Sequence, residues 1–166
     1  LSSFVNLEFI CTASTGTVHI DKVYCKKKGI TIISLTEERN VINKIPSTAE
    51  HAFALMLSSI RNINSASKSV MDGKWDYEFF IGRQLKSLTV GVIGFGRLGT
   101  FFSNYCDAFG AKVIVYDPYK SVNHPRILQT DNLETIACMS DVISLHVHVT
   151  DETNKMINKK FLKLCK

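Results

Sequence analysis

The chain of 166 residues contains few of the residues that interrupt regular structure, with only three prolines and nine glycines. This composition argues against a disordered protein. It also lacks any apolar run near the roughly 18 residues that a membrane-spanning helix requires. Residues 1–12 lack the charged start and the cleavage site of a secretory signal. We therefore expect a soluble, cytoplasmic protein with no membrane partner.

The five cysteines are few and scattered, at positions 11, 25, 106, 138 and 165, and form no Cys-x-x-Cys pair. An odd number of dispersed cysteines favours reduced thiols over a disulfide framework or a zinc site. We expect no metal site. Cys106 is interpreted as a small buried apolar residue.

The chain also lacks a basic field that extends over its whole length, although its net charge is +5. Residues 155–166 contain five lysines and no acid, so basic and acidic residues balance over the rest of the chain. These lysines alternate with apolar residues at helical spacing, which predicts the solvated face of an amphipathic helix over residues 158–165. We therefore expect no nucleic-acid partner.

A glycine-rich motif follows an apolar run at residues 88–93. In the sequence Gly94-Phe95-Gly96-Arg97-Leu98-Gly99, Gly94 would allow a tight turn and Gly96 a close approach of backbone N–H groups to a pyrophosphate. Gly99 would let the following helix pack closely on the strand. This strand, turn and helix predict a dinucleotide-binding βαβ unit.

Asp117 ends the next apolar run, 18 positions beyond Gly99. This is close to the roughly 20-residue spacing at which a carboxylate meets the adenosine ribose. A 2′-phosphate would face a like charge there, so NAD is favoured over NADP. The alternative is that Asp117 and Pro118 form only a turn. Arg97 would offer the pyrophosphate its backbone N–H, with a solvated side chain as the alternative to a direct contact.

The first residues predict a smaller βαβ unit. Residues 6–13 form a strand that ends at Ser14-Thr15-Gly16, a helix capped by Asp21 ends at Gly29, and residues 30–34 form a second strand. Because ligands collect at the carboxyl ends of such strands, the turn at residues 14–16 is either an anion site or an ordinary turn.

A long helix is predicted from Thr48 to about Val70, with Ser47 and Glu50 as a capping box. Further elements are helices over 98–109 and 132–139 and strands over 112–116 and 141–146. We predict an α/β protein, a Rossmann-type doubly wound parallel sheet with a partial flavodoxin-like substrate domain. Residues 1–45 would form the partial substrate domain, 46–71 an interdomain helix, and 72–166 the first part of the NAD-binding domain.

The histidines are interpreted by position. His51 and His124 are expected to be structural, and His19 either enters a helix or lines the ligand cleft. His146 and His148 follow the third strand of the second unit, where the cofactor crevice should open. None has a carboxylate in the same loop that would mark a general acid–base pair.

Together these residues resemble the D-isomer-specific 2-hydroxy acid dehydrogenases. The resemblance covers nearly the whole chain and rests on Thr12-Ala13-Ser14-Thr15-Gly16 with His19-Ile20-Asp21, Ala49-Glu50, Asp72-Gly73-Lys74-Trp75, the glycine motif, Tyr116-Asp117-Pro118, and Leu145-His146-Val147 with Thr150 and Thr153.

The resemblance implies a role for several of these residues. Ser14, Thr15 and Gly16 would bind the substrate carboxylate, with Thr15 also near the nicotinamide. The expected cofactor contacts are Gly94, Gly96, Arg97, Leu98 and Gly99 at the pyrophosphate, Asp117 at the ribose, and His146 and Val147 beside the adenosine. His148 stands where the family usually has proline, which leaves its role open.

The resemblance further implies an NAD-dependent oxidoreductase that transfers a hydride between nicotinamide and C2 of a 2-hydroxy or 2-keto acid, in a homodimer. The family's catalytic arginine, acid and histidine come later in the chain, so we expect a fragment that is inactive alone and has no catalytic residue of its own. One alternative is a non-catalytic, NAD-sensing interaction module that resembles corepressors of this fold. Another is a different Rossmann enzyme, which the motifs at residues 12–21 and 49–50 disfavour.

Overall fold

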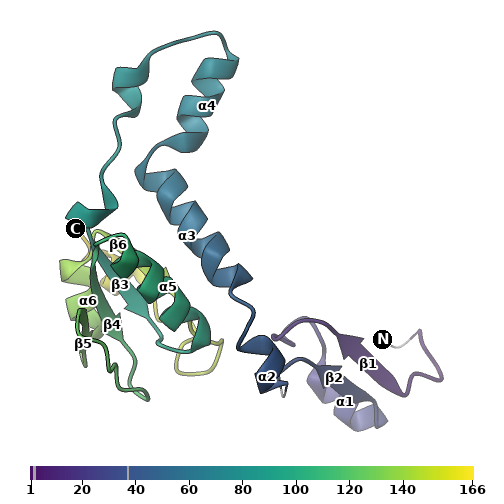
Figure 1. Cartoon of the computed structure of the whole chain (residues 1–166). Helices are drawn as coiled ribbons and strands as arrows, with labels where there is room; N and C mark the ends of the chain where they lie inside the picture. The colour runs from purple at the N-terminus through teal and green to yellow at the C-terminus, as the bar shows by residue number, and fades with distance from the viewer. Residues whose placement is uncertain (2, 37) are drawn as a thin grey trace. The chain divides into compact units, whose positions relative to one another are not determined.

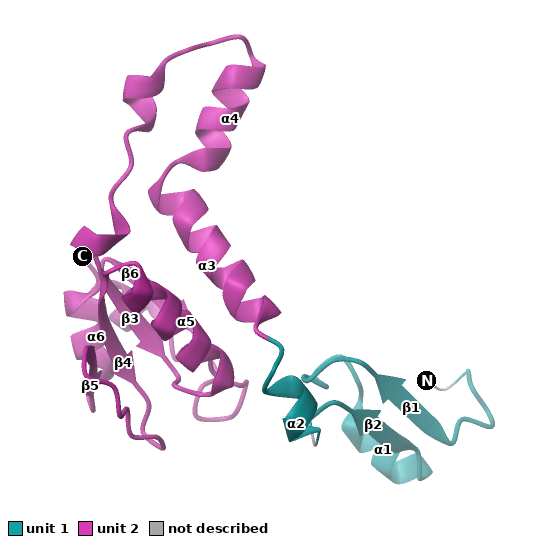
Figure 2. Cartoon of the chain, in the orientation of Figure 1, with its two compact units in different colours: residues 1–45 teal, residues 46–166 magenta. Residues whose placement is uncertain are grey.

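The computed structural model describes residues 1, 3–36 and 38–166, which form two compact units, residues 1–45 and 46–166 (Figure 2). In the first unit, β1 (Phe9–Thr12) and β2 (Thr31–Ser34) pair in parallel, joined through α1 (Lys22–Lys28), and the short α2 (Arg39–Ile42) follows. The Asp21 side chain accepts a hydrogen bond from the Tyr24 N–H at 2.9 Å, and Gly29 ends α1 with φ of 70°. The predicted cap and terminator of this helix are confirmed.

The second unit contains a four-stranded parallel sheet in the order β5-β4-β3-β6 (Figure 1). Its strands are β3 (Thr89–Ile93), β4 (Lys112–Tyr116), β5 (Ile127–Thr130) and β6 (Val142–Leu145). The chain runs outward from β3 to β5 and then returns to place β6 on the other side of β3. This reversal creates a topological switch point at the carboxyl ends of β3 and β6, where open parallel sheets bind ligands.

Two apolar cores cover the two faces of this sheet, because alternate residues of a strand point to opposite faces. On one face Val92 and Val115 belong to a core with α5 (Arg97–Ala108), which supplies Phe102 and Cys106. Burial raises the pKa of the Cys106 thiol to about 12, which agrees with its interpretation as an apolar core residue. On the other face Ile93 lies in a core with α6 (Leu133–Met139) and α7 (Lys159–Leu162).

The long predicted helix is two helices, α3 (Ser47–Ile60) and α4 (Ile63–Met71), so the prediction of one continuous helix is wrong. Asn62 adopts a left-handed conformation with φ of 54°, which asparagine tolerates better than most residues. The Ile60 carbonyl accepts a hydrogen bond from the Arg83 N–H at 2.9 Å. A Cβ at Gly82 would lie only 2.4 Å from that carbonyl oxygen, so the backbone of residues 82–83 packs closely on the end of α3.

The start of α3 also differs from its prediction. Helical structure begins at Ser47, Pro46 is the N-cap, and this cap makes no side-chain hydrogen bond, so the predicted capping box at Ser47 is absent. The Pro46 carbonyl accepts from the N–H groups of Ala49 and Glu50 at 2.8 and 3.1 Å. The first helical turn is thus closed through the backbone of Pro46.

The last third of the chain contains one strand that was not expected, β5, and a shorter helix than expected. Only Ile127 of β5 is buried, so the strand lacks the apolar run that marks β3 and β4. The helix predicted over 158–165 is limited to Lys159–Leu162, although Phe161 is buried and the lysines are exposed as expected. Among the described residues, no helix has the length and apolar character needed to cross a bilayer.

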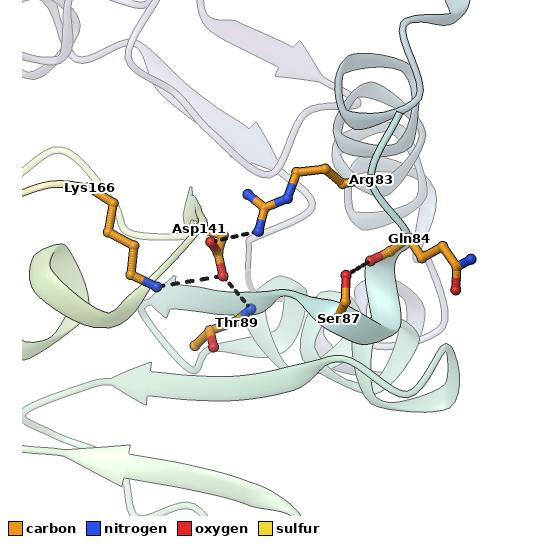
Figure 3. A network of polar contacts seen from close by, with 6 residues as sticks. All are labelled: Arg83, Gln84, Ser87, Thr89, Asp141 and Lys166. Atoms are coloured by element: carbon orange, nitrogen blue, oxygen red, sulfur yellow. Dashed lines mark hydrogen bonds and ion pairs between the residues drawn. The ribbon is translucent and has the colours of Figure 1, made fainter. Parts of the chain in front are cut away.

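A polar network fixes the amino-terminal edge of β3 and β6, at the end of the sheet opposite the switch point (Figure 3). Asp141, which precedes β6, accepts hydrogen bonds from the Thr89 N–H at 2.9 Å and from Arg83 at 3.0 Å, and lies 3.6 Å from the Lys166 ammonium. The Thr89 hydrogen bond is the main cause that holds the pKa of Asp141 below its usual value, with Arg83 and Lys166 adding to it against the opposing effect of burial.

We expect Asp141→Ala to lower the free energy of unfolding by about 2 kcal/mol at neutral pH, because it leaves the half-buried Thr89 N–H without its acceptor. Since the folded-state pKa is depressed, this stabilisation is present above the unfolded pKa of about 3.9 and is lost as the pH falls through the folded pKa. Urea unfolding at pH 7 and at about pH 3 measures both effects. Asp131→Ala, at an exposed aspartate, is the control; an equal loss in both variants, or a loss independent of pH, would contradict the assignment.

Candidate dinucleotide-binding site

The turn after β3 depends on a glycine at position 94. Gly94 has φ of 94°, a conformation that L side chains rarely adopt, and a Cβ there would lie 2.6 Å from the His146 carbonyl oxygen. Its N–H donates to the Tyr116 carbonyl at 2.8 Å. The turn is therefore held between the ends of β4 and β6, at the switch point of the sheet.

Gly99 and Gly96 serve two different purposes in the same motif. A Cβ at Gly99 would lie 2.0 Å from the Gly94 carbonyl oxygen, so the first turn of α5 packs directly on the backbone of the glycine turn. A Cβ at Gly96, by contrast, would meet nothing within 4 Å. Gly96 is the N-cap of α5, and Arg97 and Leu98 open the helix. Open space in front of a helix N-terminus is the arrangement that binds phosphate.

Asp117 connects this turn to the loop that follows β4. Its Oδ2 accepts from the Phe95 N–H at 2.7 Å, and its Oδ1 accepts from the N–H groups of Tyr119 and Lys120 at 2.9 and 3.0 Å. The sequence predicted the position of Asp117 at the end of the strand. It did not predict that the same carboxylate binds backbone groups of both the glycine turn and the loop after β4.

The loop after β4 has further anchors that sequence reasoning missed. Gln129, on the unexpected strand β5, hydrogen-bonds to three backbone groups of residues 117–122. Arg126 forms a two-pronged ion pair with Asp107 of α5 at 2.8 and 2.5 Å, which is the main cause that lowers the pKa of Asp107. Spacing alone offered no signal for these contacts, because each joins residues from elements whose adjacency only the fold establishes.

A hydrogen bond between side chains joins the loops after β4 and β6. The Tyr119 hydroxyl donates to the Glu152 carboxylate, and this contact is the main cause that raises the pKa of Tyr119. The tyrosine therefore stays protonated at neutral pH. Both loops belong to the carboxyl edge of the sheet, on either side of β3.

His146 lies beneath the glycine turn. Its Nε2 is 2.9 Å from the Ser144 Oγ, its ring centroid is 4.9 Å from that of Phe102, and burial lowers its pKa. It is thus a neutral packing residue, and Val147 beside it also contacts the space around Gly94. His148 is exposed, and its carbonyl accepts from the Thr153 hydroxyl at 2.5 Å.

The other histidines lie outside this site. His19 and His51 are exposed, and His124 lies 3.9 Å from Asp107. No group of three or more metal-ligating side chains occurs within the described part of the chain.

In the first unit, the turn at Ser14, Thr15 and Gly16 follows the carboxyl end of β1. The Ser14 Oγ accepts from the Gly16 N–H at 3.1 Å, and the Thr15 carbonyl accepts from the Thr36 hydroxyl at 2.9 Å. The turn is therefore held in shape by short-range side-chain contacts and by the segment after β2.

The switch-point geometry, the glycine turn and the strand-end carboxylate define a dinucleotide-binding α/β protein of the Rossmann type. The sequence profile described as "D-isomer specific 2-hydroxyacid dehydrogenase, NAD binding domain" matches residues 53–166. The chain belongs to the D-isomer-specific 2-hydroxyacid dehydrogenase family and carries its NAD-binding domain, as the resemblance in its sequence predicted.

Individual relatives agree with this family. The chain is 37% identical to hydroxypyruvate reductase of Thermotoga maritima over 93% of this chain and 49% of the relative. It is 36% identical to D-3-phosphoglycerate dehydrogenase of Archaeoglobus fulgidus over 93% of this chain and 29% of the relative. Among solved structures, D-lactate dehydrogenase of Aquifex aeolicus, complexed with NAD and lactic acid, matches with a TM-score of 0.78 and 37% identity, over 99% of this chain and 49% of that one. The chain thus spans about half, or less, of the length of these proteins.

The contrast between Gly99 and Gly96 generates a test of the turn. We expect Gly99→Ala to lower the free energy of unfolding by about 2 kcal/mol or more, because the new methyl group overlaps the Gly94 carbonyl. Gly96→Ala should change it by less than about 0.5 kcal/mol, since φ at Gly96 is −69° and the site is open. Urea unfolding of both variants measures this difference, and equal stabilities would refute the close helix–turn contact.

Proposed function

We propose that the second unit binds NAD at the carboxyl edge of its sheet, in the orientation that the glycine turn dictates. The pyrophosphate would lie over Gly94, Gly96 and Gly99 and accept from the N–H groups of Arg97 and Leu98. The observation that carries this assignment is the combination of open space at Gly96 with the start of α5.

The adenosine would extend from the glycine turn toward the loop after β4. Asp117 would accept hydrogen bonds from the ribose hydroxyls and would repel a 2′-phosphate, which favours NAD over NADP. His146 and Val147 would form the wall of the adenosine side, which is supported by their packing against Gly94.

For substrate, we assign the turn at Ser14, Thr15 and Gly16 to the carboxylate of a 2-hydroxy or 2-keto acid, with Thr15 also near the nicotinamide. The position after β1 supports this role, since strand-end turns present backbone N–H groups to anions. The matched enzymes named for hydroxypyruvate, phosphoglycerate and lactate all act on acids of this class.

The whole enzyme would be an oxidoreductase that interconverts a 2-hydroxy acid and a 2-keto acid, with the nicotinamide of NAD accepting the hydride from C2 of the hydroxy acid. Within it, residues 1–45 would belong to the substrate domain, 46–71 to the connection between domains, and 72–166 to the NAD-binding domain. No residue of this chain is assigned the proton-transfer step, so the chain alone would bind nucleotide without turning over substrate. A cytoplasmic location is part of the proposal, supported by five free cysteines.

We also assign a homodimer, formed through the segment around α4 and η1 (Tyr77–Phe80). Large apolar side chains are exposed there, with Met71 at 87%, Trp75 at 79% and Phe79 at 82%. A groove of about 260 Å³ between α4 and η1 includes Val70 and Tyr77. Large apolar side chains exposed on one segment are typical of a protein–protein interface, and a second copy would cover them.

The ribose assignment predicts a change in cofactor preference. Asp117→Asn should weaken NADH binding about tenfold and should reduce the ratio of NADH to NADPH affinity, because the charge that attracts hydroxyl donors and repels a 2′-phosphate is removed. Titration of the chain with each nucleotide, followed by nucleotide fluorescence, measures both constants. Asp131→Asn is the matched control, and an unchanged affinity ratio in Asp117→Asn would remove Asp117 from the ribose site.

The dimer assignment predicts that a charge on the exposed apolar segment separates the subunits. Phe79→Asp should raise the dimer dissociation constant at least about tenfold, since it places a carboxylate in the contact. Analytical ultracentrifugation measures the constant. Val23→Asp, at a residue of α1 that is 80% exposed, should leave it unchanged; a wild-type protein that is monomeric at all concentrations would overturn the dimer.

A further inference from the structure

The loop of residues 117–122 must hold Asp117 in a defined orientation, yet it lies outside any helix or strand. Since no helix or strand ladder pairs its backbone groups, side chains that bond to them add order to such a loop. The strand beside it, β5, supplies one. In the sheet Gln129 pairs with Val115 and Thr130 with Tyr116, so Gln129 lies next to the end of β4 from which the loop departs.

The Gln129 side chain uses both ends of its amide on this loop. Its Nε2 donates to the Lys120 carbonyl at 2.7 Å and to the Asp117 carbonyl at 3.3 Å. Its Oε1 accepts from the Val122 N–H at 2.8 Å. One side chain thus closes the loop at its beginning, middle and end.

Only a primary amide of this length offers two donors and an acceptor in one plane. Glutamate would set a negative charge against two carbonyl oxygens, and lysine would leave the Val122 N–H without an acceptor. The three bonds also share the entropy cost of ordering a single side chain, so they hold the loop more effectively than three separate contacts would.

Asp117 also holds the backbone of Lys120, through the peptide group on its other side. The Lys120 N–H donates to the Asp117 carboxylate at 3.0 Å while the Lys120 carbonyl accepts from Gln129. Movement of the Lys120 backbone would therefore turn the Asp117 carboxylate away from its position beside Phe95. We propose that Gln129 is a positioning residue for the adenosine ribose, which acts by preorganising Asp117. This inference rests on the proposed role of Asp117 and extends it to a residue that acts through the loop of residues 117–122.

The test is a double-mutant cycle on the whole chain with NADH as the probe. Gln129→Met keeps the length of the side chain and removes its hydrogen bonds. It should weaken NADH binding about tenfold in the wild-type background and by less than about twofold in the Asp117→Asn background. A merely structural role would give the same factor in both backgrounds. Gln84→Met, which removes an exposed amide outside the loop, is the matched control and should bind NADH as the wild type does.

Amide hydrogen exchange of the free chain provides a readout that requires no nucleotide. Exchange at Val122 should accelerate in Gln129→Met and not in Gln84→Met. Affinity within twofold of wild type in Gln129→Met, or equal losses in both backgrounds, would overturn the role of Gln129. If Asp117→Asn binds NADH as tightly as wild type, the ribose assignment itself fails and the inference fails with it. If Asp117→Asn binds weakly while Gln129→Met binds tightly, only the positioning role of Gln129 is refuted.

Discussion

The close contact between the first turn of α5 and the glycine turn is the constraint on which the second unit depends. Because nothing larger than a hydrogen atom fits between Gly99 and the Gly94 carbonyl, the helix begins directly at the end of β3. Its N-terminus therefore lies at the carboxyl edge of the sheet, beside the space left open at Gly96. The packing of backbone on backbone thus creates both the fold of the βαβ unit and the helix end at which we propose that the pyrophosphate binds.

The irregular segments around the sheet are held by a few polar side chains. Asp141 satisfies the N–H that begins β3, and Asp117 satisfies N–H groups of the glycine turn and of the loop after β4. Gln129, on β5, satisfies backbone groups of the loop of residues 117–122. Helices and strands satisfy their own backbone groups, whereas these segments cannot, so single carboxylates and amides determine their shape.

Much of the cofactor-binding half was predictable, because its signals are local. The apolar runs of β3 and β4, the glycines at 94, 96 and 99, and Asp117 lie within one continuous stretch. The edge strand β5 was missed since only Ile127 is buried in it, and its other residues carry no apolar pattern. The end of α3 was missed because the apolar pattern continues past it, whereas Asn62 adopts a left-handed conformation and the Ile60 carbonyl bonds to Arg83, far away in sequence.

The sequence by itself determined the class of fold, the family and the identity of the glycine turn. The periodicity of apolar residues and the backbone freedom of glycine are local properties, so they can be read from residues that are close together in the sequence. Only the tertiary structure decided what supports the site: the neutral His146 beneath the turn, the Tyr119–Glu152 contact and the three bonds from Gln129. The physical reason is that hydrogen bonds and desolvation depend on distance in space. Residues on β4, β5 and β6 approach each other only after the parallel sheet has formed.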